Sequence, residues 1–163
     1  PHTEGSTIME RPTLVLLDLE ETVVDDWASR NFLFYKMERV KRFLEQFKPF
    51  TLGLMSWAVY DDADLKVFHD ELEGPLCEFF DSTFEAAWSL DEWQRRLLKC
   101  KGLKAERKDM FDCFGKHETL FMCRNDPLFT NRRVLLVDDV VEHGLAFNTS
   151  NNNFTNFVNV DQL

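Results

Sequence analysis

The chain has 163 residues, of which 44% are apolar or aromatic, and its formal net charge at pH 7 is −10. A chain of this length and composition can bury a sizeable core as one domain. Its negative charge repels the phosphodiester backbone, which argues against non-specific nucleic-acid binding but is compatible with an enzyme that meets phosphate through a divalent cation.

The chain carries the signs of a soluble protein from a reducing compartment. Residues 1–8 (PHTEGSTI) are interpreted as a vector-derived remnant before Met9, and residues 9–163 as a single domain. No apolar run approaches 18 residues and no secretory leader is present, so we expect a cytoplasmic protein without a membrane partner. The cysteines form no CxxC pair and are expected to be buried, reduced thiols. They are Cys77, Cys100, Cys113 and Cys123.

The first half of the chain alternates between predicted strands and helices. Residues 14–17 (LVLL) form a short apolar run, which is typical of a strand buried on both faces. Residues 33–47 carry apolar side chains at steps of three or four, which predicts a helix with one face on a sheet. Residues 52–55 (LGLM) predict a second strand, and residues 64–73 predict a helix that ends at Gly74-Pro75.

The second half continues this alternation. Residues 84–88 predict a strand, and Asp91 is expected to cap the next helix. The segment KHETLF from Lys116 can begin another helix. Strands are predicted at 134–137 (VLLV) and 154–160, a surface loop at 148–153, and no structure is assigned to 102–115. The alternation predicts an α/β fold, a three-layer sandwich with a mostly parallel central sheet.

Three of the predicted strands stop at a polar residue. Asp18 follows the first, Ser56 follows the second, and the pair Asp138-Asp139 follows the strand at 134–137. Because ligands of such sheets bind beyond the carboxyl ends of the strands, we expect these residues to meet in one crevice. Acidic groups gathered there repel each other unless a cation compensates them. Oxygen ligands, bound waters and a substrate phosphate suit Mg²⁺.

These residues resemble the motifs of the haloacid dehalogenase-like (HAD) phosphatases. Asp18-Leu19-Glu20-Glu21-Thr22 is similar to the first motif, DxDx(T/V), after an apolar strand. Ser56 is similar to the second motif and Asp138-Asp139 to the fourth, and all appear in the order of the family. The resemblance spans residues 14 to about 144 and implies a Rossmann-like HAD fold and a magnesium-dependent phosphatase.

The resemblance implies a role for each matching residue. Asp18 is the expected nucleophile, which forms an aspartyl-phosphate intermediate. Glu20 is the expected acid/base group, and its backbone carbonyl a metal ligand. Ser56 and a lysine, for which we choose Lys116, are expected to contact the phosphoryl group. The expected metal ligands are Asp18, Glu20, Asp138 and Asp139, and the expected substrate-binding residues are Thr22, Ser56 and Trp57.

Several alternatives stay open at this point. Glu20 stands where the family has Asp, and an extra methylene leaves a working enzyme, a slow one, or a binding module without turnover. Trp57 and Tyr60 suit either the mouth of a site or packing, and neither His117 nor His143 suggests a caged zinc. Other lysines compete with Lys116: Lys99, Lys101, Lys104 and Lys108.

The spacing of the motifs bears on the substrate. The 33 residues between Thr22 and Ser56 leave no room for a large inserted cap. By analogy, capless members have open sites, so the expected partner is a phosphorylated small molecule, a phosphoprotein or a nucleic-acid end. A response-regulator receiver domain is disfavoured because its acidic pair lies on the first strand. No nucleotide-binding glycine motif is present.

Overall fold

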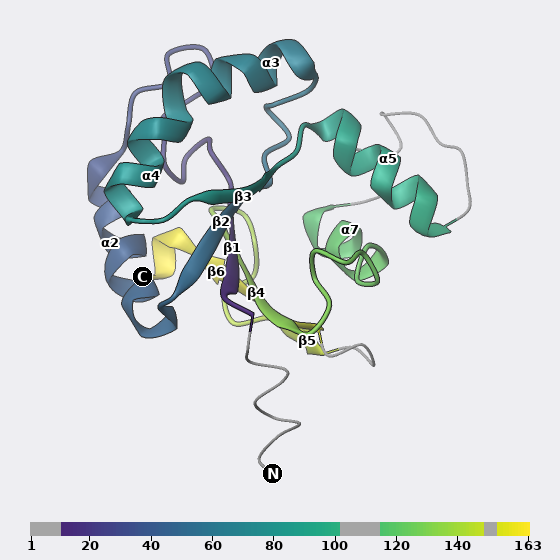
Figure 1. The fold of residues 1–163 in the computed structure, drawn as a ribbon. Helices are drawn as coiled ribbons and strands as arrows, with labels where there is room; N and C mark the ends of the chain where they lie inside the picture. The colour runs from purple at the N-terminus through teal and green to yellow at the C-terminus, as the bar shows by residue number, and fades with distance from the viewer. Residues whose placement is uncertain (1–10, 102–114, 149–152) are drawn as a thin grey trace.

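The computed structural model of the chain describes residues 11–101, 115–148 and 153–163. Its centre is a six-stranded sheet with the order β3-β2-β1-β4-β6-β5, parallel throughout except for β5 (Figure 1). The strands are β1 (Thr13–Leu17), β2 (Phe50–Leu54), β3 (Phe84–Ala87), β4 (Arg132–Asp138), β5 (Ala146–Asn148) and β6 (Asn153–Asn159). The predicted α/β fold with a mostly parallel sheet is thereby confirmed.

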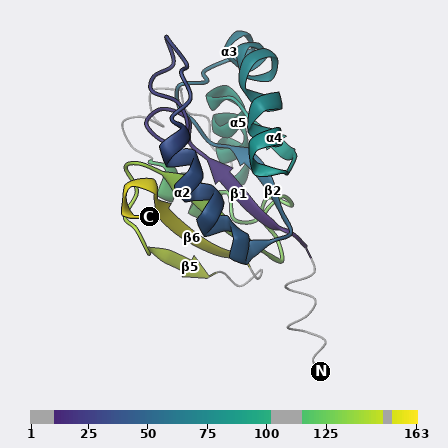
Figure 2. The ribbon, with the colours of Figure 1, turned by 90° about the vertical axis from the view of Figure 1, so that its left-hand side faces the viewer.

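Helices cover both faces of this sheet. One face is packed by α2 (Phe34–Leu44), α3 (Asp62–Val67), a π-helical segment (Phe68–Glu73) and α4 (Gly74–Phe80) (Figure 2). The other face is packed by α5 (Leu90–Lys101) and α7 (Lys116–Met122), which Figure 1 shows on the opposite side of the strands. Short 3₁₀ turns follow α2 (Glu45–Phe47) and β6 (Val160–Gln162). The layers are thus helix, sheet and helix, as the alternation predicts.

The central strand β1 explains why the sequence shows continuous apolar runs. Its side chains alternate between the two faces, so Val15 and Leu17 pack under α2 while Leu14 and Leu16 pack under α5. All four are fully buried. A strand with helices on both faces therefore needs no polar residue until it ends.

Two predicted helix boundaries are wrong. Gly74-Pro75 does not end a helix, because the chain continues through it into α4 with Pro75 in the first turn. The π-helical segment just before widens the helix, which accommodates a residue without an N–H. The cap of α5 is Ser89 rather than Asp91, because the Ser89 Oγ accepts a hydrogen bond from the Glu92 N–H at 3.2 Å.

Other expectations meet mixed outcomes. The predicted surface loop at 148–153 is wrong at its two ends, since Asn148 belongs to β5 and Asn153 to β6, and residues 149–152 lie outside the described part of the chain. The thiols of Cys77, Cys100 and Cys123 are free, but of these three only Cys123 is buried, while Cys77 is half-buried and Cys100 is exposed. The unassigned residues 102–114, which include Cys113, and the proposed remnant 1–8 lie outside the described part of the chain. Within the described residues, no helix is long and apolar enough to cross a bilayer.

A buried arginine holds together the amino ends of the strands. Arg132, at the start of β4, is only 1% exposed. Its guanidinium donates to both carboxylate oxygens of Glu85 on β3, at 2.8 and 3.0 Å, and to the carbonyl of Pro12 just before β1. The Thr51 hydroxyl of β2 also donates to Glu85, at 2.6 Å. This clamp joins four segments that are far apart in the sequence.

Replacing Arg132 with methionine should lower the free energy of unfolding by about 3 kcal/mol, because the substitution leaves a partly buried carboxylate and a carbonyl without their donors. Urea unfolding at neutral pH measures the loss. The matched control is Arg42→Met on α2, for which a change within about 0.5 kcal/mol is expected. An equal effect of both substitutions would argue against the clamp.

Acid should weaken the same clamp. Burial acts to raise the pKa of Glu85, but hydrogen bonds from Arg132 and Thr51 outweigh it, so the pKa lies below its ordinary value of 4.5. The contribution of Glu85 to stability is therefore complete above about pH 4.5 and is lost as the pH falls through its folded pKa. As the pH falls from about 4.5 through the folded pKa of Glu85, the free energy of unfolding should decrease less in a Glu85→Gln variant than in wild type. In the control variant Glu38→Gln, whose residue is exposed, it should decrease as much as in wild type.

Candidate functional site

The polar residues that end the strands lie at one edge of the sheet. In the parallel registers, Leu17 of β1 pairs with Leu54 of β2 and with Val137 of β4. The backbone of Asp18 donates to the carbonyl of Val137 at 3.0 Å. Because the three strands end level, Asp18, Ser56 and Asp138 open onto the same crevice, as expected from the strand ends.

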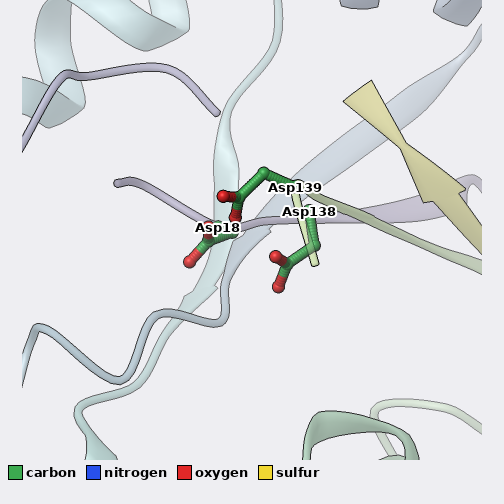
Figure 3. Close-up of side chains that lie close together, drawn as sticks. All are labelled: Asp18, Asp138 and Asp139. Atoms are coloured by element: carbon green, nitrogen blue, oxygen red, sulfur yellow. The ribbon is translucent and has the colours of Figure 1, made fainter. Parts of the chain in front are cut away.

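Three carboxyl groups converge in this crevice. One oxygen from each of Asp18, Asp138 and Asp139 lies within 4.8 Å of the others. Figure 3 shows Asp18 approaching from the end of β1, and the other two from the end of β4. Asp138 is completely buried and Asp18 is 7% exposed. A group of carboxylate oxygens this close can hold a metal ion, since hard divalent cations bind such ligands.

A lysine from the opposite side of the crevice bridges two of these acids. Lys116 is the first residue of α7, and its Nζ lies 2.8 Å from Asp18 Oδ1 and 2.6 Å from Asp138 Oδ2. Burial acts to lower the pKa of Lys116, but the charges of Asp18 and Asp138 outweigh it and raise the pKa. The ammonium group is therefore charged throughout the neutral range and offsets part of the acidic charge.

Burial and neighbouring charges shift the pKa values of two of the acids. Burial raises the pKa of Asp18, with Lys116 opposing it and Asp138 adding to it. Burial, a hydrogen bond with Asp138 and the charge of Asp18 raise the pKa of Asp139 to about 7. Both directions mean that a further negative charge is unfavourable in this crevice, and that added positive charge would stabilise the ionised carboxylates.

Further contacts hold the acidic side chains in place. The Thr22 hydroxyl, fully buried, donates to Asp18 Oδ2 at 3.2 Å. The Val140 N–H donates to Asp138 Oδ1 at 3.1 Å. Ser56 is also buried, and its Oγ accepts a hydrogen bond from the Ala58 N–H at 3.3 Å. The structure thus places Thr22 as a support of Asp18, while its expected contact with a substrate stays a prediction.

Glu20 lies at the rim of the crevice. Its carboxylate is exposed and accepts a hydrogen bond from the Trp27 N–H at 2.8 Å. It lines one cavity of about 360 Å³ together with Asp18, Ser56, Trp57, Lys116 and Asp139. Asp138 lines it as well, so every predicted side chain except the buried Thr22 lines this cavity, and the Glu20 carboxylate is held by Trp27 rather than by the acidic cluster.

The other candidates lie elsewhere. Lys99 is exposed on α5, and Lys104, Lys108 and the side chain of Lys101 lie outside the described residues. His143 accepts a hydrogen bond from the backbone of Asn159. The acidic residues after Ser56 serve the helix, as expected, since Asp61 caps α3 by accepting from the Asp64 N–H at 3.1 Å.

One supporting residue was missed by the sequence analysis. Asn159 ends β6, and its Nδ2 donates to the carbonyl of Asp139 at 3.2 Å and to that of Val141 at 2.9 Å. It therefore fixes the backbone that carries the acidic pair. The signal was available, because Asn159 is a polar residue near the end of a predicted strand, as Asp18 and Ser56 are.

Replacing Asn159 with alanine should weaken divalent-cation binding at the acidic cluster by about tenfold, since supports behind metal ligands commonly contribute that much. Calorimetric titration measures the affinity. Asn156→Ala on the same strand is the matched control, because the Oδ1 of Asn156 is buried and has no hydrogen-bond partner among the described residues. Equal affinities of the Asn159 variant and wild type would rule out this supporting role.

No protein-family model, curated protein or solved structure matches this chain.

Proposed function

We propose that this protein is a magnesium-dependent phosphohydrolase, similar to the HAD phosphatases, that cleaves phosphate monoesters through an aspartyl-phosphate intermediate on Asp18. The observation that carries the proposal is the convergence of Asp18, Asp138 and Asp139 within 4.8 Å, with the Lys116 ammonium group against two of them. Such an enzyme needs a nucleophile, metal ligands and a phosphate-binding cation close together, and these residues would supply all three.

The residues present fit a divalent cation. Three carboxylates face one lysine, so a divalent cation would bring the local charge close to neutral. Asp18, Asp138 and Asp139 would hold it through their side chains, and the Glu20 carbonyl is the further ligand that the resemblance implies. Oxygen ligands favour Mg²⁺. When bound, Mg²⁺ supplies positive charge that stabilises the phosphoryl oxygens during transfer.

In the proposed reaction, an oxygen of Asp18 attacks phosphorus while the bond from phosphorus to the ester oxygen breaks. Glu20 gives its proton to that leaving oxygen. Lys116 and the Ser56 hydroxyl bind the phosphoryl oxygens and offset their charge. Glu20 then takes a proton from a water whose oxygen attacks the phosphorus, and the cleaved bond returns Asp18 as a carboxylate and releases phosphate. Thr22 holds Asp18 in position through the hydrogen bond at 3.2 Å.

A second candidate function rests on Glu20. Its Oε2 accepts the Trp27 N–H, which leaves Oε1 to carry the proton that general acid catalysis requires. If Oε1 does not reach the leaving oxygen while Trp27 holds the carboxyl group, the domain binds phosphorylated ligands without turnover. The proposed substrates are phosphorylated small molecules, phosphoproteins or nucleic-acid ends, and the proposed compartment is the cytoplasm.

A panel of phosphate esters decides between the two functions. Hydrolysis of an aryl phosphate should require added Mg²⁺, stop with a chelator and resume when Mg²⁺ is restored. Mg²⁺ alone should also raise the thermal midpoint, because it binds the folded protein only. The Asp138→Asn and Asp139→Asn variants should lose this thermal shift.

Two results would count against the enzyme. Turnover at an unchanged rate in the presence of the chelator would exclude a role for Mg²⁺ in the reaction. Absence of turnover across the whole panel, together with Mg²⁺-dependent binding of a phosphonate, would favour the binding module.

A further inference from the structure

A second cavity adjoins the acidic crevice. It has a volume of about 430 Å³ and shares Trp57, Lys116 and Val140 with the crevice that contains Asp18. This volume lies within the roughly 300–1,000 Å³ of small-molecule sites. The two cavities therefore meet at the proposed phosphoryl position, and an ester bound there can extend into the second.

The walls of this cavity are mainly aromatic and aliphatic. Beyond the shared residues, its apolar side chains are those of Val141, Leu145 and Phe157, and His117 adds a further ring. The His117 ring meets the Phe157 ring edge-on, with 5.2 Å between the ring centroids. Flat aromatic surfaces of this kind pack well against another ring. The apolar part of the lining thus suits a flat, apolar group.

Contacts within the protein hold the walls of this cavity in place without a ligand. Trp57 packs edge-on against the fully buried Trp93, whose Nε1 donates to the Leu54 carbonyl at 3.2 Å. The opposite wall is tied to β6, because the N–H of Phe157 donates to the Leu145 carbonyl at 2.8 Å and Asn159 holds Val141. A pocket that is formed in advance loses little conformational entropy on binding.

The charges around the cavity indicate which chemical groups of a ligand it excludes. Lys116, the cation at the end shared with the crevice, is already engaged by Asp18 and Asp138. Glu118 and Glu142 also line the cavity and are exposed. Two carboxylates there repel a second phosphate or a carboxylate on the ligand. The occupant is therefore apolar away from its phosphoryl group.

We propose that this cavity binds the aromatic leaving group of an aryl phosphate monoester, whose phosphoryl group lies at Asp18. The inference rests on the proposed function for the place of the phosphoryl group. It assigns the substrate class as aryl phosphates with one or two rings and without a second negative charge. Hydrolysis releases the corresponding phenol and inorganic phosphate.

The test fills the cavity from a wall that is not part of the proposed chemistry. Leu145→Trp should lower the ratio of kcat/KM for 1-naphthyl phosphate to kcat/KM for acetyl phosphate by at least about tenfold, through KM. The matched control is Ala146→Trp, because Ala146 is exposed and does not line the cavity. Val141→Phe, from the same wall, serves as a second variant if Leu145→Trp does not fold.

Binding separates this inference from the proposed function. Naphthylmethyl phosphonate should bind wild type with Mg²⁺, and Leu145→Trp should weaken this binding by at least about tenfold, whether or not any ester is hydrolysed. Loss of phosphonate binding in Leu145→Trp without any turnover in wild type would overturn the function and support the pocket. Turnover with an unchanged naphthyl-to-acetyl ratio in both wall variants would support the function and overturn the pocket.

A ligand with a second negative charge tests the effect of the carboxylates at the cavity. Phenyl phosphate should be preferred over 4-carboxyphenyl phosphate, and Glu142→Gln should reduce this preference. The same preference in wild type and Glu142→Gln would overturn the assignment of charge at the cavity.

Discussion

Replacing Asp18 with asparagine is expected to abolish magnesium-dependent hydrolysis of an aryl phosphate, with a loss in kcat of about 10³-fold or more. The amide of asparagine is a poor nucleophile towards phosphorus, although it keeps the size and shape of the side chain. Thr22 can still donate to the remaining oxygen, and Lys116 still has Asp138 as a partner. The loss should therefore reflect chemistry rather than unfolding.

The measurement is steady-state release of phosphate, with circular dichroism and the thermal midpoint to show that the variant is folded. Asp62→Asn, on the exposed first turn of α3, is the matched control and should keep full activity. Brief reaction with a ³²P-labelled ester should label wild type but not the Asp18 variant. Hydrolysis by folded Asp18→Asn at more than about a tenth of the wild-type rate would remove Asp18 from the proposed role.

Lys116→Met is expected to have the second-largest effect, and it should act on stability as well as on activity. Without the ammonium group, two buried carboxylates face each other without compensation. Breaking a buried ion pair from one side costs about 3–5 kcal/mol, so the metal-free variant should unfold that much more easily. Turnover should fall by about 10²-fold or more, because the transferred phosphoryl oxygens lose a cation.

Magnesium should restore part of this loss, which makes the experiment specific. A cation held by the same carboxylates replaces some of the missing positive charge. Urea unfolding with a chelator and with added Mg²⁺ should thus show a larger metal effect in Lys116→Met than in wild type. The exposed Lys99→Met is the control. Equal stabilisation of wild type and Lys116→Met by Mg²⁺ would show that Lys116 does not compensate the acidic cluster.

The fold was predictable from sequence because its central strands are buried on both faces. Apolar runs such as residues 14–17 and 134–137 leave little choice of structure, and the residues that follow them mark one edge of the sheet. Strand direction puts Asp18 and Asp138 at the same edge of the sheet, and their convergence also depends on the pairing of β1 with β4, which the structure shows. The choice of Lys116 needed the resemblance, which calls for a lysine before the acidic pair, together with the helix that the segment KHETLF predicts from Lys116.

Other features depended on contacts that no local pattern carries. The three-residue strand β5 exists through its pairing with β6, and its own sequence has no strand signal. In the sequence, Arg132 resembles an ordinary surface charge, because its partners Glu85 and Pro12 are far away along the chain and meet it only in the folded protein. The hydrogen bond from Trp27 to Glu20 likewise depends on how the segment after β1 folds back. Tertiary contacts decide these features, and local propensity does not.

The place of β1 in the sheet has a consequence for synthesis of the protein on the ribosome. β1 is translated before β4, which is one of its two neighbours in the sheet and whose Arg132 lies 120 residues after Pro12. Until β4 has been translated, one edge of β1 lacks its partner and Leu14 and Leu16 lack part of their cover. We expect this edge of β1 to stay unpaired during the interval, and the acidic cluster to form only after β4 has been translated, because Asp138 and Asp139 come with that strand.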